Sequence, residues 1–139
     1  MTFGRPAKLA VTALAALHLL VTLWHAQAHG ELGIGLPPWK LAYVYAVIVI
    51  APPLAAALIW TRFARAGLWI FTLAMVGSLL FASYHHYILV SPDNVAHLPE
   101  GSAEARARFV DSAALSALLE LGAALCGAFA LGRAARAGA

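Results

Sequence analysis

Residues 9–29 read LAVTALAALHLLVTLWHAQAH. The stretch holds no acidic residue, lysine or arginine, and a helix of about 20 such residues crosses the hydrocarbon core of a bilayer. We therefore expect a membrane-spanning helix over 8–29. Its ionisable side chains are the three histidines His18, His25 and His29.

Three more apolar runs follow, at 39–60, 67–90 and 107–132. The chain of 139 residues is 63% hydrophobic and only 11% charged, a balance unlike that of a soluble domain. It lacks the alternating ten-residue pattern that is typical of membrane barrels. We expect one all-α integral membrane domain over 1–139, a bundle of four transmembrane helices surrounded by lipid bilayer.

Basic residues predict the orientation of this bundle, because cytoplasmic loops of membrane proteins are enriched in lysine and arginine. Six of the nine precede the first span, fill the 61–66 loop or follow the last span: Arg5, Lys8, Arg62, Arg65, Arg133 and Arg136. Arg106 and Arg108 depart from this pattern, but acidic residues beside them partly neutralise their charge. We expect both termini in the cytoplasm and the loops 30–38 and 91–106 outside, in the plasma (inner) membrane of a prokaryote. No basic patch with interleaved aromatic residues indicates a nucleic-acid partner.

The N-terminus has a second interpretation. A basic start, an apolar stretch and the triplet Ala26-Gln27-Ala28 resemble a cleavable signal peptide. Cleavage after Ala28 leaves His29 as the new N-terminus, where the amine and the imidazole together chelate copper. The length of the apolar stretch and the histidine within it favour the uncleaved span.

Histidines gather at the outward ends of the first and third spans. His25 and His29 stand four residues apart, so a helix presents both imidazoles to one ion. The third span offers His85 and His86, whose side chains point about 100° apart on a helix, so we expect only one of the two to join the first pair.

The loop after the third span adds a histidine and a carboxylate to this set. Several imidazoles with a carboxylate suit copper, zinc or iron and do not suit magnesium or calcium. We therefore predict a transition-metal site on the outward face, for metal handling or redox chemistry, with these candidate ligands: His25, His29, His85, His86, His97 and Asp93. No motif decides whether the protein is an enzyme.

Two alternatives stay open at this stage. A b-type haem needs one histidine from each of two facing helices, which the first and third spans provide, and Gly77 is small enough to relieve crowding by a porphyrin. The other alternative is an accessory subunit of a membrane complex whose histidines are structural. The fourth span is rich in small residues that favour close helix packing within the bundle, in a homo-oligomer or in a larger complex: Ala113, Ala117, Gly122, Ala123 and Gly127.

A buried polar pair is expected near the middle of the bundle. Glu120 lies within the fourth span, where an ionised carboxylate is costly unless it is paired or hydrated. His18 lies at similar depth in the first span and on the same helical stripe as His25, within about 40°. We expect His18 and Glu120 to pair, either as a polar clasp between helices or as a proton-relay step.

Two local features complete the predictions. Pro52 and Pro53 interrupt the second span and predict a bend, because proline removes a helical hydrogen bond and clashes with the preceding turn. Ser102 is expected to cap the fourth helix.

Overall fold

The computed structural model describes residues 4–136, and within that range it is all-helical, with no strand. The first helix is α1 (Arg5–Glu31), and a second helical run comprises α2 (Pro38–Tyr43), the π-helix η1 (Val44–Ile50) and α3 (Ala51–Leu58). The third run comprises α4 (Ala64–Ser83) and the π-helix η2 (Tyr84–Ile88), and the fourth is α5 (Ala103–Arg136). These four runs are each long and apolar enough to cross a membrane. The prediction of four such helices is confirmed, with ends that differ from the predicted spans by one to four residues.

The helix ends follow from local sequence. Gly33 adopts a left-handed φ of 63°, which favours glycine, and this lets the Ile34 amide donate to the His29 carbonyl at 2.9 Å and close α1. At the start of α5, the Ser102 hydroxyl accepts a hydrogen bond from the Ala105 amide at 3.1 Å. The predicted Ser102 cap is confirmed.

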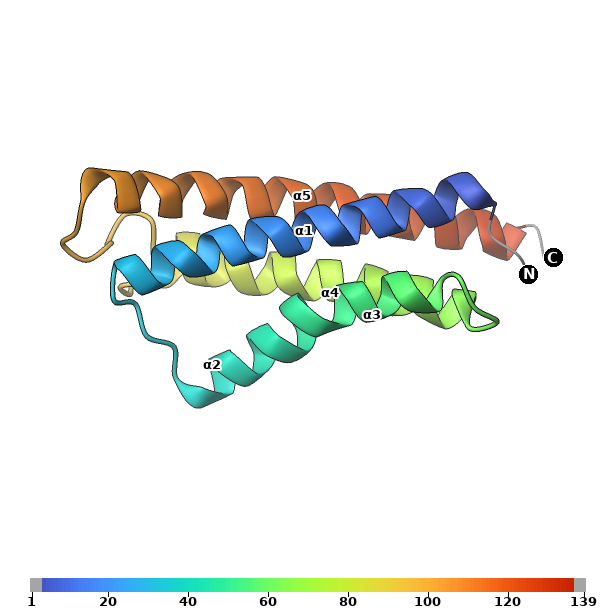
Figure 1. Ribbon diagram of the computed structural model, residues 1–139, viewed down its shortest axis with the longest axis horizontal. Coiled ribbons are helices and arrows are strands. Elements are labelled where there is room, and N and C mark those ends of the chain that lie inside the picture. Colours follow the sequence, from blue (N-terminus) through green and yellow to red (C-terminus); the bar gives the residue numbers. More distant parts are fainter. Residues whose placement is uncertain (1–3, 137–139) are drawn as a thin grey trace.

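The four runs lie antiparallel to their neighbours in a long bundle (Figure 1). The start of α1, the end of α5 and the turn between α3 and α4 share one end of it, and the two longer loops share the other. Contacts of His18 with Glu120 and of His25 with Ser112 fix the register between α1 and α5. The predicted grouping of the basic segments at one end is therefore present in the fold.

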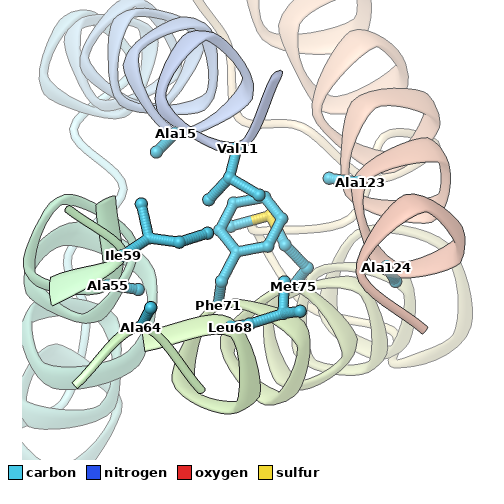
Figure 2. Close-up of a cluster of buried hydrophobic side chains, with 10 residues drawn as sticks. All are labelled: Val11, Ala15, Ala55, Ile59, Ala64, Leu68, Phe71, Met75, Ala123 and Ala124. Atoms are coloured by element: carbon cyan, nitrogen blue, oxygen red, sulfur yellow. The ribbon is translucent and has the colours of Figure 1, made fainter. Parts of the chain in front are cut away.

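A cluster of ten buried apolar side chains fills the half of the bundle nearer the termini, drawn from α1, α3, α4 and α5 around Phe71 (Figure 2). Half of the cluster is alanine, and small side chains let helix backbones approach closely. A Cβ added at Gly127 would lie 2.3 Å from Thr72 Oγ1, so α4 and α5 meet there at a distance that only glycine allows. One of the small residues predicted for close packing therefore acts within the bundle.

The second helical run bends at the predicted place but by a geometry that was not predicted. Pro52 and Pro53 lie in the first turn of α3, and the residues before them form the π-helix η1, in which the Ala51 amide donates to the Ala46 carbonyl. Because proline lacks the amide that would continue the α-helical ladder, the backbone widens to i→i+5 bonding. As a result α2 and η1 diverge from α1 toward the loop end of the bundle (Figure 1).

Candidate metal centre

Three imidazoles converge at the loop end of the bundle. His25 and His29 extend from α1 and His86 from η2, and one nitrogen from each ring lies within 4.8 Å of the other two. The fully buried Phe109 of α5 packs against all three rings, with centroid distances of 4.6, 5.1 and 5.3 Å. We call His25, His29 and His86 the histidine triad.

Each ring of the triad has its Nδ1 atom beside a hydrogen-bond acceptor. His25 Nδ1 lies 2.8 Å from the Ser112 hydroxyl oxygen, and that hydroxyl donates its own proton to the Arg108 carbonyl at 2.6 Å. His86 Nδ1 lies 2.9 Å from the Asp93 carbonyl oxygen, and His29 Nδ1 lies 3.4 Å from the Ile34 carbonyl oxygen. For His25 and His86 these acceptors favour the proton on Nδ1 and leave the lone pair of the neutral ring on Nε2. His29 has an acceptor beside each nitrogen, because its Nε2 lies near the Asp93 carboxylate.

The Nε2 atoms then face other electron-rich atoms. His25 Nε2 and His29 Nε2 are 3.2 Å apart, and His29 Nε2 is 3.2 Å from Asp93 Oδ1. Two lone pairs at this distance repel each other unless a proton or a metal ion lies between them. The triad therefore forms a point of negative potential, which either a proton on one Nε2 atom or a cation between the rings relieves.

Asp93 completes this point from the loop after η2. Its Oδ1 atom is buried and lacks a hydrogen bond of good geometry within the described residues, although His86 Nδ1 also lies 3.3 Å away. Burial alone raises the pKa of the Asp93 carboxyl, but the adjacent imidazoles of His29 and His86 outweigh burial and hold this pKa well below its usual range. Asp93 is accordingly a carboxylate at neutral pH.

The loop segment that carries Asp93 is held by Asn94. The side-chain Nδ2 of Asn94 donates to the Leu89 carbonyl at 3.0 Å, and the side-chain Oδ1 accepts from the Ala96 backbone amide at 2.9 Å. The Val95 amide in turn donates to the His86 carbonyl at 3.0 Å. Asp93 is thus fixed against the triad by the hydrogen bonds of the residues that follow it in the loop.

The structure leaves two predicted ligands outside the triad. His85 points away from it, where its Nδ1 accepts a hydrogen bond from Lys40 at 3.1 Å and its ring packs against Phe81, because successive helical side chains diverge by about 100°. His97 is exposed in the loop, and its Nδ1 lies 3.3 Å from Asn94 Oδ1. Of the six predicted ligands, the structure brings together His25, His29, His86 and Asp93.

A cavity of about 410 Å³ extends from the triad toward the middle of the bundle. The triad and Asp93 line one part of it, Ser116 and Glu120 of α5 line another, and η1 supplies an apolar wall. It lies where η1 diverges from α1, so the widened helix before the two prolines helps to form it.

The predicted polar pair borders this cavity. His18 Nε2 and Glu120 Oε1 are 3.1 Å apart, and both side chains are buried. His18 Nδ1 and Glu120 Oε2 have no hydrogen-bond partner in the part of the chain that the structure describes. Glu120 also lines the cavity, at the part farther from the loop end.

Several residues of this centre carry no ligand pattern in the sequence. Ser112 and Phe109 resemble ordinary residues of an apolar helix, and Asn94 resembles a turn residue. Gly77, considered as a position that relieves crowding by a porphyrin, instead lies against Tyr43 and Val47.

No protein-family model, no curated protein and no solved structure matches this chain.

Proposed function

We propose that the protein is an integral membrane protein that binds one transition-metal ion through the Nε2 atoms of His25, His29 and His86, with Asp93 as a fourth ligand. The observation that carries the proposal is that one nitrogen of each ring lies within 4.8 Å of the other two, on rings whose Nδ1 atoms already have an acceptor. Metal-binding histidines almost always donate their other N–H to a carbonyl, carboxylate or water, which fixes the tautomer and the ring orientation.

The spacing of the nitrogens supports an ion of the zinc or copper class. Two imidazoles that bind one tetrahedral ion at about 2.0–2.1 Å have nitrogens about 3.3 Å apart. His25 Nε2 and His29 Nε2 are 3.2 Å apart, so these two ligands need almost no rearrangement. Three imidazoles with one carboxylate suit zinc, copper or iron, whereas magnesium and calcium prefer oxygen ligands.

The surroundings of the triad also favour an ion rather than a haem. Phe109 packs against all three rings, and the ring centroids of His25 and His86 are only 4.8 Å apart. A porphyrin needs an open plane between its two axial ligands, and the packed rings offer a point instead. The apolar shell lowers the local dielectric, which strengthens the attraction between the ion and Asp93.

Surface composition supports the placement in a membrane. Large apolar side chains on three different helices are exposed to the surroundings by 64–70%, far more than a water-facing helix tolerates in such numbers: Leu20, Leu80 and Leu118. The basic residues at the end that holds the termini favour a cytoplasmic location for that end. The triad then lies on the extracytoplasmic side of a plasma membrane, where metal handling or redox chemistry takes place at the outward face.

The test is a metal-binding measurement on purified protein in lipid nanodiscs. The wild-type protein is stripped with a chelator, dialysed against zinc, copper(II) or iron(II), and analysed for bound metal. We expect one equivalent of at least one of these ions. His25→Ala and His86→Ala abolish tight binding, whereas His85→Ala and His97→Ala retain it, because only the first two rings belong to the triad.

This design separates a specific site from general histidine affinity. The two control substitutions remove the same side chain from the same end of the bundle. Equal loss of metal in all four variants, or no stoichiometric metal in the wild-type protein, overturns the proposal.

A further inference from the structure

The cavity beneath the triad has the dimensions of a small-molecule site. Its volume of about 410 Å³ falls within the range of about 300–1,000 Å³ that is typical of ligand-binding pockets. It is lined from four helical runs, since Leu23 belongs to α1, Val44 and Ile48 to η1, Ala82 to α4 and Glu120 to α5. Such a cavity is mostly apolar, with a few polar groups that orient a ligand.

The apolar wall of the cavity is formed by η1, on the side where the second helical run diverges from α1. Val44, Tyr45 and Ile48 of η1 line the cavity, and this run diverges from α1 toward the loop end (Figure 1). On α1, Leu23 and Ala26 line the cavity although both are exposed. The cavity therefore opens between α1 and η1, at the level of the apolar part of both helices, and a ligand enters it from the lipid.

Glu120 supplies an unsatisfied acceptor at the far part of the cavity. Its Oε1 atom pairs with His18, and its Oε2 atom is buried without a hydrogen-bond partner among the described residues. A buried acceptor without a hydrogen-bond donor destabilises the fold. Because His18 already faces the carboxylate, the ligand has to bring a hydrogen-bond donor and not a second cation.

The cavity ends at this level. None of the ten apolar side chains around Phe71 lines it, and these side chains fill the space between α1, α3, α4 and α5 (Figure 2). A ligand therefore reaches Glu120 through the cavity and not through the packed half of the bundle.

We propose that the cavity binds one lipid-soluble hydroxyl compound, an alcohol or a phenol. Its hydroxyl donates to Glu120 Oε2, its apolar body packs against Val44 and Ile48, and its other end faces the histidine triad. Anionic compounds are excluded because Asp93 and Glu120 both line the cavity. That this compound is the substrate of the metal centre rests on the proposed function, whereas its binding requires no metal.

The test uses two probes that differ in a single donor, para-hexylphenol and para-hexylanisole. Binding of each probe to the metal-free protein in detergent micelles is measured by native mass spectrometry, which counts bound molecules per chain. We expect one para-hexylphenol per chain, with an affinity at least about tenfold greater than that of para-hexylanisole, since a hydrogen bond to a charged acceptor is roughly twice as strong as a neutral one.

Three variants report on the placement of the probe. Val44→Trp fills the cavity and weakens para-hexylphenol at least about tenfold, whereas Val76→Trp, the same change at an exposed position of α4, leaves binding unchanged. Glu120→Gln replaces the carboxylate by a neutral amide and reduces the preference for the phenol to about threefold or less.

Equal affinity for the two probes indicates that an acyl chain of a lipid fills the cavity, and it overturns the proposal. Unchanged binding in Val44→Trp overturns it as well. Metal content is measured on the same preparations, so a protein that selects the phenol but binds no metal refutes the proposed function alone.

Discussion

Ser112 provides the most informative single perturbation of the metal centre. Its hydroxyl accepts the Nδ1 proton of His25 at 2.8 Å while donating to the Arg108 carbonyl. The direction of both hydrogen bonds is therefore determined, and the His25 lone pair is directed toward the triad. Ser112→Ala removes the acceptor and leaves all proposed ligands in place.

The expected effect of Ser112→Ala falls on the metal-bound state. With metal on Nε2, the Nδ1 proton of His25 remains buried without an acceptor, which costs about 1–3 kcal/mol. Without metal the ring can adopt the other tautomer and donate its Nε2 proton to His29, 3.2 Å away. Since about 1.4 kcal/mol corresponds to a tenfold change in affinity, we expect metal binding to weaken about 10- to 100-fold, as for other outer-shell partners of metal-binding histidines.

The assay is competition for zinc against a fluorescent chelator, with the protein in nanodiscs. Ser116→Ala is the matched control, because Ser116 lines the cavity one turn farther along α5 and its hydroxyl is not hydrogen-bonded to the triad in the described structure. We expect the control to bind zinc as the wild type does. A dissociation constant for Ser112→Ala within about twofold of the wild-type value refutes the reasoning, because outer-shell losses are normally larger.

Three further predictions concern stability. The pKa of Asp93 is held low in the folded protein, so its carboxylate stabilises the fold at pH values above its unfolded pKa of about 3.9. This stabilisation is lost as the pH falls below that value. Asp93→Asn should therefore lower the melting temperature at pH 7, and the difference from wild type should shrink below about pH 4. Gly127→Ala places a Cβ 2.3 Å from Thr72 Oγ1, whereas Gly122→Ala meets nothing within 4 Å, so thermal unfolding should begin earlier for the first variant alone. Phe71→Ala removes the centre of the apolar cluster and should destabilise the protein by about 3–5 kcal/mol without changing metal stoichiometry, and a parallel loss of metal in the folded variant would contradict the separation of core and site.

The number and extent of the helices could be predicted because they depend on a coarse property. Runs of about 20 apolar residues form helices in a bilayer, where every backbone group has to be bonded within the chain. The ends were less predictable, since α5 begins at Ala103, several residues before the apolar run, in a turn that Ser102 caps. Such ends depend on single hydrogen bonds and not on composition.

The candidate site could be predicted only where helical periodicity determines it. His25 and His29 share a helix face at a spacing of four, so their proximity follows from sequence. Which of His85 and His86 joins them does not follow from sequence. Both lie in the π-helix η2, where the Leu89 amide donates to the Tyr84 carbonyl. No residue type in that segment predicts a π-helix.

The remaining parts of the site depend on contacts between distant segments. Asp93 reaches the triad because Asn94 folds the loop back onto η2, and Ser112 reaches His25 across 87 positions of sequence. The cavity depends on the divergence of η1, for which Pro52 and Pro53 predict a bend but not its direction. These features require the packed bundle and cannot be read from any local pattern.

X-ray absorption spectroscopy of the zinc-loaded protein tests the central claim most directly, because it reports the ligands of the ion itself. We expect three imidazole nitrogens and one carboxylate oxygen at about 2.0–2.2 Å. One imidazole is lost in His86→Ala, loaded at zinc concentrations high enough to occupy its weakened site, and none is lost in His85→Ala. A zinc site with fewer than two imidazoles, or a first shell that is identical in the two variants, would contradict it.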